Sequence, residues 1–151
     1  MANQYWNKKV VVITGGSSGI GLAAAKQLSS AGAQVWLAAR RPELLETALM
    51  EVQAARRDPS QNCGIVFADV SDFQQATRII ETVTKSAGAP DVLINSAGIS
   101  QPGYVQELSP EVFEQLMQVN YLGTVYVTAA ALPAMIKRGS GHIINLSSMA
   151  G

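Results

Sequence analysis

Glycine and serine residues gather in one short stretch near the amino terminus, with the composition of a phosphate-binding turn. The stretch reads Thr14-Gly15-Gly16-Ser17-Ser18-Gly19-Ile20-Gly21. Glycine tolerates positive φ angles and lets a backbone approach a pyrophosphate closely. A helix that begins at such a turn offers free amides and the positive end of its dipole to phosphates. Glycines also form ordinary turns, so the chemistry depends on whether a strand precedes this stretch and a helix follows it.

The flanking residues supply that context. Residues 10–14 form an apolar, β-branched run typical of a buried strand, and residues 18–31 carry apolar side chains at helical spacing. A glycine-rich turn between a strand and a helix is the setting in which dinucleotides bind. We therefore expect a nicotinamide dinucleotide at this turn, whose spacing is T-G-x-x-x-G-x-G rather than G-x-G-x-x-G.

Strands and helices alternate along the rest of the chain. Further strands are expected at residues 34–39, 64–68, 91–95 and 142–146. Further helices are expected at residues 42–57 and 71–87 and from Pro110 to about Arg138, with Ser71 and Ser109 as N-caps. Right-handed crossovers of this length predict an α/β fold, a doubly wound parallel sheet with helices on both faces. We expect the strand order 3-2-1-4-5. The long connection after the fourth strand lies where such sheets bind ligands.

Two arginines follow the second strand, where the type of dinucleotide is selected. Folds that prefer NAD usually carry a carboxylate there, about 20 residues beyond the turn, which binds the ribose hydroxyls. This chain has Ala39 followed by Arg40 and Arg41. A guanidinium pairs with a 2′-phosphate, and Ser17 would add a hydroxyl contact. We predict NADPH in preference to NAD, the alternative being that both arginines are solvated residues at a helix start.

Five motifs in order make the chain resemble the short-chain dehydrogenase/reductase family. They are the glycine-rich turn, Asp69-Val70, Asn95-Ser96-Ala97-Gly98, Asn120 and Leu146-Ser147-Ser148-Met149-Ala150-Gly151. The resemblance implies a single Rossmann domain over residues 1–151 and a reductase that uses a nicotinamide dinucleotide. The cofactor-binding residues that it implies are Gly15, Ser17, Ser18, Gly19, Ile20, Gly21, Arg40, Arg41, Asp69, Val70, Asn95, Ala97 and Gly98.

The resemblance also assigns roles to polar residues. It implies that Asp69 bonds the adenine amino group, that Asn95 steadies the sheet, and that the backbone carbonyl of Asn120 holds a water in a proton relay. It implies that Ser148 hydrogen-bonds the substrate carbonyl and stabilises the developing oxyanion. Spacing alone does not separate Ser148 from Ser147. The residues alone leave Asp69 as a capping or turn aspartate, and Asn120 as a surface asparagine that is out of place in an apolar helix.

The acid of the family has no counterpart here. It is a tyrosine roughly a dozen residues beyond the serine, with a lysine four residues further on. The match of Tyr5 with Lys9 precedes the first strand, which puts it at the amino edge of the sheet. The fifth strand would also be an open apolar edge, which natural folds avoid. We therefore expect the first part of a longer enzyme, which lacks the family's later strands and is inactive alone. His142, at the start of the fifth strand, is expected to be a structural or solvated residue.

Two classes of function remain open. The first is an NADPH-dependent enzyme that reduces a ketone to an alcohol. Residues 120–126 and 15–19 make it similar to 3-ketodihydrosphingosine reductases, and a 3-oxoacyl carrier-protein reductase or a hydroxysteroid-type dehydrogenase is the alternative within the family. The second class is a non-catalytic dinucleotide-binding module or an inactive fragment, because the chain has most of a cofactor site and lacks the acid.

Composition restricts partners and location. Lys plus Arg is 11 and Asp plus Glu is 11, and this zero net charge argues against nucleic acid. Cys63, the single cysteine, permits neither an internal disulfide nor a zinc cluster and fits a reducing compartment. Residues 121–136 look too short and interrupted for a membrane span. We expect a cytoplasmic protein without a metal that acts on a small carbonyl substrate such as a lipid-like ketone. When full length, it is expected to be a homodimer or homotetramer.

Overall fold

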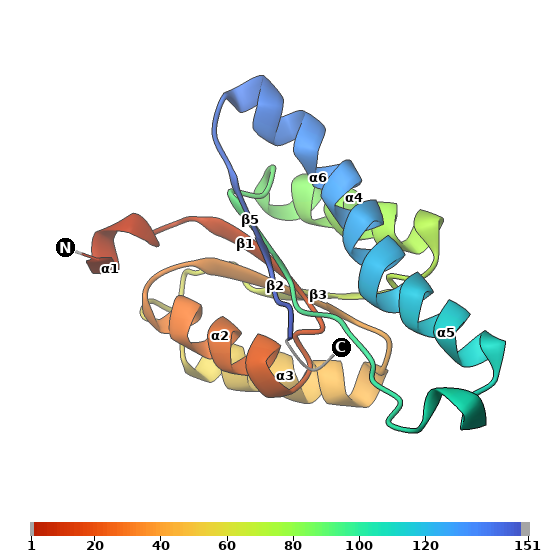
Figure 1. Ribbon diagram of the computed structural model, residues 1–151. Coiled ribbons are helices and arrows are strands. Elements are labelled where there is room, and N and C mark those ends of the chain that lie inside the picture. The colour runs from red at the N-terminus through yellow and green to blue at the C-terminus, as the bar shows by residue number, and fades with distance from the viewer. Residues whose placement is uncertain (1, 149–151) are drawn as a thin grey trace.

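The computed structural model describes residues 2–148 and contains a five-stranded parallel sheet between two layers of helices (Figure 1). The strands are β1 (Val10–Thr14), β2 (Gln34–Ala39), β3 (Gly64–Phe67), β4 (Val92–Asn95) and β5 (His142–Asn145). Their order is β3-β2-β1-β4-β5, and each neighbouring pair is parallel. The predicted fold class and strand order are therefore confirmed.

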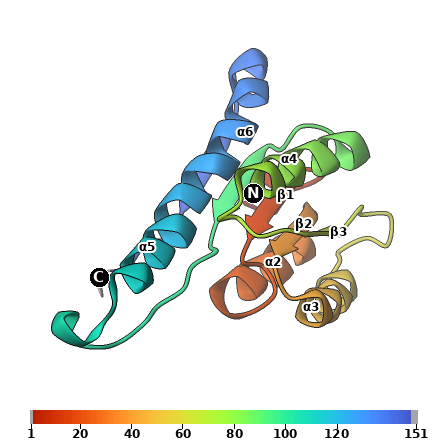
Figure 2. The same ribbon diagram turned by 90° about the vertical axis from the view of Figure 1, so that its right-hand side faces the viewer.

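The helices cover both faces of the sheet, as Figure 2 shows from the side. They are α1 (Ala2–Tyr5), α2 (Gly19–Ser30), α3 (Pro42–Ala54), α4 (Phe73–Ala87), α5 (Pro110–Met117) and α6 (Gly123–Arg138), together with the 3₁₀ turn η1 (Val105–Glu107) and the π turn η2 (Gln118–Leu122). Successive strand side chains point to opposite faces. Val11 and Ile13 of β1 therefore pack with α2 and α3, and Val10 and Val12 pack with α4 and α6.

The start of α4 differs from its prediction. Ser71 was expected to cap this helix, but Asp72 is the N-cap, and its carboxylate accepts a hydrogen bond from the backbone N–H of Gln75 at 2.8 Å. The hydroxyl of Ser71 instead donates to the carboxylate of Asp69 at 2.7 Å. The expectation failed because a partner two residues earlier holds the serine side chain, and a carboxylate is favoured at the positive end of a helix.

The helical path from Pro110 to Arg138 is continuous through α5, η2 and α6. By length and composition alone it could cross a membrane, with a mean hydropathy of 1.4, so the expectation that residues 121–136 are too short does not apply to the whole helix. One side packs on the sheet through Val127, Ala131 and Met135. Its other side exposes a row of apolar side chains, formed by Phe113, Met117, Tyr121, Val125, Leu132 and Ile136.

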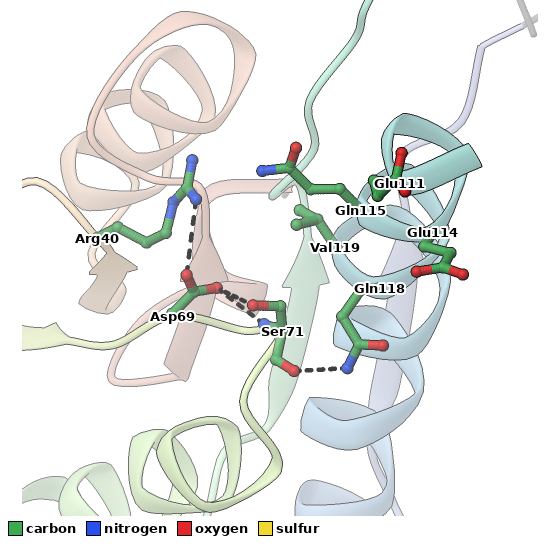
Figure 3. A pocket seen from close by; sticks show the side chains of 8 residues that line it. All are labelled: Arg40, Asp69, Ser71, Glu111, Glu114, Gln115, Gln118 and Val119. Atoms are coloured by element: carbon green, nitrogen blue, oxygen red, sulfur yellow. Dashed lines mark hydrogen bonds and ion pairs between the residues drawn. The ribbon is translucent and has the colours of Figure 1, made fainter. Parts of the chain in front are cut away.

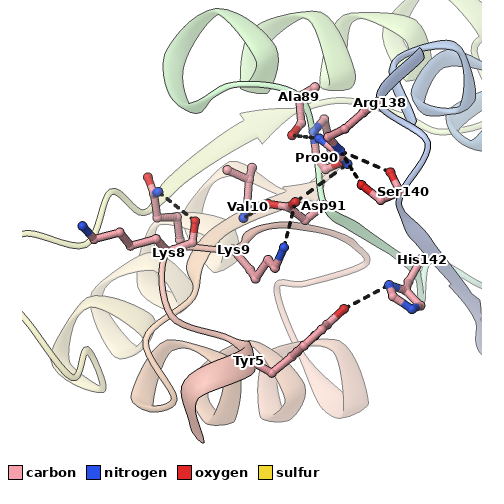
Figure 4. Close-up of polar contacts among 11 residues, drawn as sticks. Tyr5, Lys8, Lys9, Val10, Ala89, Pro90, Asp91, Arg138, Ser140 and His142 are labelled. Atoms are coloured by element: carbon pink, nitrogen blue, oxygen red, sulfur yellow. Dashed lines mark hydrogen bonds and ion pairs between the residues drawn. The ribbon is translucent and has the colours of Figure 1, made fainter. Parts of the chain in front are cut away.

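Polar contacts fix the amino edge of the sheet (Figure 4). The carboxylate of Asp91 lies 3.3 Å from Lys9 Nζ and 3.8 Å from Arg138 Nη2. The hydroxyl of Tyr5 lies 3.0 Å from Nδ1 of His142. Tyr5 and Lys9 therefore lie at the amino edge, as expected, and His142 has a structural contact there.

Candidate active site

The glycine-rich turn packs directly against the loop that leaves β4. Gly15 has a φ of +66°, and a Cβ at this residue would lie 2.7 Å from the Cα of Ala97. A Cβ at Gly21 would lie 2.6 Å from the carbonyl oxygen of Gly15. The hydroxyl of Thr14 accepts hydrogen bonds from the backbone N–H groups of Ser96 and Ala97, each at 3.2 Å. Glycine is thus required at Gly15 and Gly21 because two backbones approach each other here.

The outer side of the same turn is open. Gly19 has a φ of +54°, and a Cβ there would meet no atom within 4 Å. Ser18 is the N-cap of α2, and its side chain makes no capping hydrogen bond. The first amides of this helix are therefore available to an anion. Ile20 is 70% exposed beside them, whereas Ser17 is buried. An open, positively polarised helix start fits the phosphates of a dinucleotide.

A second part of the site is an open pocket of about 380 Å³ between the ends of β2 and β3 and the helix α5 (Figure 3). Its lining residues are Arg40, Asp69, Ser71, Glu111, Glu114, Gln115, Gln118 and Val119. Arg40 Nη1 lies 3.6 Å from Asp69 Oδ2, and the Arg40 side chain is half exposed. Arg41, the N-cap residue of α3, is exposed and does not line this pocket.

Asp69 is held as a carboxylate. Its partial burial raises its pKa, but the hydrogen bonds from Ser71 and the neighbouring guanidinium of Arg40 outweigh this effect, so its pKa lies below the ordinary value. The backbone N–H and the hydroxyl of Ser71 both donate to Oδ1, at 2.9 and 2.7 Å. The other oxygen therefore faces Arg40 and the pocket. Asp69 orients Arg40 at the pocket wall and is ionised at neutral pH.

Asn95 joins three elements at the carboxyl end of β4. It is 3% exposed, and its Nδ2 donates to Thr128 Oγ1 at 3.1 Å and to Asn145 Oδ1 at 2.8 Å. These bonds connect β4 with α6 and β5, which suits the predicted role in steadying the sheet.

Asn120 lies within the π turn η2. Its Oδ1 accepts the backbone N–H of Ile99 at 2.8 Å, and its Nδ2 donates to the Ile99 carbonyl at 2.9 Å. A Cβ on Gly98 would lie 3.4 Å from the same Oδ1. The backbone carbonyl of Asn120 accepts the hydroxyl of Thr124 at 3.1 Å. The side chain of Asn120 thus anchors the loop after β4.

The remaining predicted residues lie at the same edge of the sheet. Val70 is buried beside Asp69. Ser147 and Ser148 are exposed and follow β5, and the last three residues of their motif lie outside the described residues. Within residues 2–148, no group of three His, Cys, Asp or Glu side chains is arranged to hold a metal ion.

Sequence reasoning missed several residues that connect these parts. Asn145 pairs with Asn95, Gln118 bonds the loop after β3, and Thr124 bonds the carbonyl of Asn120. No sequence signal marks these three residues, because each is an ordinary polar residue in its element. Gly123 did carry a signal, since an interior glycine costs a helix about 1 kcal/mol relative to alanine and so indicates a packing requirement.

Known proteins match this chain over nearly its whole length. A family model described as short chain dehydrogenase matches residues 9–151. Dehydrogenase/reductase SDR family member 7B of Bos taurus is 39% identical over 150 residues, covering 97% of this chain and 46% of that protein. The 3-ketodihydrosphingosine reductase of Bos taurus is 37% identical over 142 residues, covering 93% of this chain and 43% of that protein.

The architecture matches solved structures equally well. The L-sorbose reductase of Gluconobacter frateurii, in complex with NADPH and L-sorbose, superposes with a TM-score of 0.88 at 31% identity, covering 95% of this chain and 53% of that one. The chain spans about half the length of the proteins it matches.

Proposed function

Since this chain belongs to the short-chain dehydrogenase/reductase family of oxidoreductases, we propose that the whole protein is an NADPH-dependent reductase that converts a ketone into an alcohol. The observation that carries this proposal is the glycine-rich turn. Gly15 and Gly21 bring it against the β4 loop, and Gly19 leaves its outer side open at the start of α2. This arrangement suits a dinucleotide pyrophosphate.

The preference for NADPH is supported by the residues after β2. Ala39 occupies the position where a carboxylate would bind ribose hydroxyls, and Arg40 follows it at the wall of the pocket. A half-exposed guanidinium suits a 2′-phosphate, because its planar set of donors matches phosphate oxygens. Arg41 takes a lesser part in the proposal, since it lies outside the pocket lining.

The chemistry is divided between the dinucleotide and the protein. When bound, a reduced nicotinamide supplies a hydride to a carbonyl carbon. Ser148 donates a hydrogen bond to the substrate carbonyl oxygen and stabilises the negative charge that develops there. Asn120 holds a water at its backbone carbonyl and thereby takes part in proton delivery. In the family the acid is a tyrosine that follows the serine, with a lysine four residues further on. The 151 residues contain no such pair after Ser148, and we expect them to be inactive without it.

We propose a lipid-like ketone as the substrate, with 3-ketodihydrosphingosine as the first compound to test. The support is the 37% identity to a protein named as a 3-ketodihydrosphingosine reductase. A 3-oxoacyl thioester on a carrier protein and a ketosteroid are the alternative substrates of the same chemical class.

The proposal is tested by titrating the native protein with NADPH and NADH and then following the loss of nicotinamide absorbance after each ketone is added. We expect tighter binding of NADPH and its oxidation by at least one of the three ketones. Binding of NADPH without oxidation by any of them would favour the alternative function, a non-catalytic dinucleotide-binding module. The absence of binding would refute both functions.

We further propose a cytoplasmic homodimer or homotetramer. The exposed apolar row on α5 and α6, defined above, supports self-association, because contiguous apolar surface of this kind marks interaction sites. Light scattering on the native protein should give twice or four times the monomer mass, and a monomer at micromolar concentration would contradict the assembly. Cell fractionation tests the location.

A further inference from the structure

The loop after β3 is wedged against the π turn η2. Val70 is 6% exposed, and its side chain lies over Gly123, the first residue of α6. A Cβ on Gly123 would lie 2.7 Å from Val70 Cγ2 and 3.2 Å from the Val70 carbonyl oxygen. Real side chains do not approach so closely, so an alanine at this position would displace either the loop or the helix.

A hydrogen bond fixes the same two segments at the other end of the π turn. Gln118 Nε2 donates to the backbone carbonyl of Ser71 at 2.8 Å (Figure 3). Ser71 in turn donates two hydrogen bonds to Asp69, the residue expected to meet the adenine. Gln118 therefore reaches Asp69 through one intervening residue.

The π turn also holds the loop after β4. Gln118 and Gly123 bracket the turn, and the N–H of Gly123 donates to the carbonyl of Gln118 across it. Asn120 lies between them and makes two hydrogen bonds to Ile99. One short segment thus contacts the expected adenine loop on one side and, on the other, the loop after β4 that packs against the glycine-rich turn. Such π turns are frequently found at functional sites.

We propose that Gln118 and Gly123 are positioning residues that couple occupation of the adenine pocket to the position of Asn120. The proposal rests on the proposed dinucleotide function. When adenosine binds at Asp69, the Ser71 carbonyl and Val70 are immobilised, and through Gln118 and Gly123 the π turn is held in the arrangement in which Asn120 bonds Ile99. The coupling acts through geometry, and neither positioning residue needs to touch the reacting atoms.

The steric contact is tested with Gly123→Ala, Val70→Ala and the double variant. Alanine is a better helix former than glycine, so helix propensity alone predicts a more stable protein for Gly123→Ala. We expect instead about tenfold weaker binding of adenosine 2′,5′-bisphosphate, a probe that contains only the adenosine half, because a displacement of a few tenths of an ångström impairs binding and positioning. Val70→Ala removes the nearest atom, Val70 Cγ2, and leaves the Cβ and the carbonyl oxygen of that residue at 3.1 and 3.2 Å. The double variant should therefore bind the probe more tightly than Gly123→Ala.

The hydrogen bond is tested with Gln118→Met, which preserves length and removes the donor. Gln74→Met is the matched control, because Gln74 is an exposed residue of α4 outside the pocket lining. The reporter is hydrogen exchange of the Ile99 amide, which Asn120 Oδ1 accepts. In the native protein and in Gln74→Met, saturating adenosine 2′,5′-bisphosphate should slow this exchange. In Gln118→Met, the slowing should be lost at equal saturation.

The outcomes separate this proposal from the proposed function. If the probe binds the native protein and leaves Ile99 exchange unchanged, the coupling is refuted while dinucleotide binding stands. Equal slowing in Gln118→Met, or a double variant as weak as Gly123→Ala, would also refute it. Failure of the native protein to bind the probe, NADPH or NADH would refute the dinucleotide function, and the coupling with it.

Discussion

Replacing Arg40 by aspartate should reverse the preference between the two dinucleotides. Arg40 is half exposed at the wall of the pocket, where it faces Asp69 at 3.6 Å. A hydrogen bond between charged groups contributes about 1.5–3 kcal/mol, and the exposure of Arg40 places its contact with a 2′-phosphate near the lower end. The new carboxylate also repels the phosphate, by about 1 kcal/mol at a water-exposed position. The sum corresponds to roughly 30-fold to 100-fold weaker binding of NADPH.

Binding of NADH should be unchanged or tighter, because a carboxylate at this position accepts hydrogen bonds from ribose hydroxyls. The free energy of unfolding should fall by no more than about 2 kcal/mol, since the exposed ion pair of Arg40 with Asp69 contributes about 0–1 kcal/mol and the repulsion between the two carboxylates about 1 kcal/mol. Calorimetric titration with both dinucleotides measures the ratio of their dissociation constants. The difference between native protein and variant should also shrink in high salt, as the Debye length falls from about 10 Å at 0.1 M to about 3 Å at 1 M.

Lys85→Asp is the matched control for Arg40→Asp. This substitution makes the same change in net charge. Lys85 lies in the last turn of α4 and does not line the pocket. An unchanged preference in Arg40→Asp would refute the reasoning and leave Arg40 as a surface residue. An equal shift in Lys85→Asp would show that net charge, rather than a local contact, determines the preference.

Three further substitutions test other parts of the site. Gly15→Ala combines a left-handed φ of +66° with a contact of 2.7 Å to Ala97, and should lower the free energy of unfolding by about 2–4 kcal/mol in a urea titration; a loss below about 0.5 kcal/mol would contradict the close approach. A carboxylate with a lowered pKa stabilises the fold above its unfolded pKa and loses this effect as the pH falls through its folded pKa. In Asp69→Asn the free energy of unfolding should therefore fall less steeply as the pH is lowered into the acid range. Identical pH dependence in native protein and variant would contradict this reasoning. Ser148→Ala should lower kcat of the whole enzyme roughly 10²-fold to 10³-fold with NADPH affinity preserved, and unaltered turnover would exclude its role in polarising the carbonyl.

The elements were predictable where local chemistry decides them. The bounds of β1 and β2 agree with the sequence prediction because each strand is a run of apolar residues that ends at a glycine or a charged residue. Both faces of a parallel sheet are covered, so continuous apolar runs are the expected pattern. The strand order 3-2-1-4-5 was also predicted, and the structure has it.

The details that depend on distant partners were not predictable. Ser71 has the right residue type for an N-cap, yet the carboxylate of Asp69 holds its hydroxyl and Asp72 caps α4. Helical periodicity continues through residues 110–138 and does not mark the π turn. Asn120 was recognised as misplaced, but its partner Ile99 lies 21 residues away in the chain, and only the fold brings the two together.

The placement of the site follows from the topology. The chain leaves β1 toward β2 and β3 on one side and returns to β4 and β5 on the other, and the helices that follow β1 and β4 cover opposite faces of the sheet. At such a switch point a crevice forms that no crossover helix fills. The glycine-rich turn, the Asn95 loop and the serines after β5 all begin there, whereas the contacts of Asp91 and Tyr5 lie at the opposite edge. Substitutions at the amino edge should therefore change stability with little effect on dinucleotide selection, because the sheet separates them from every residue that the ligand would contact.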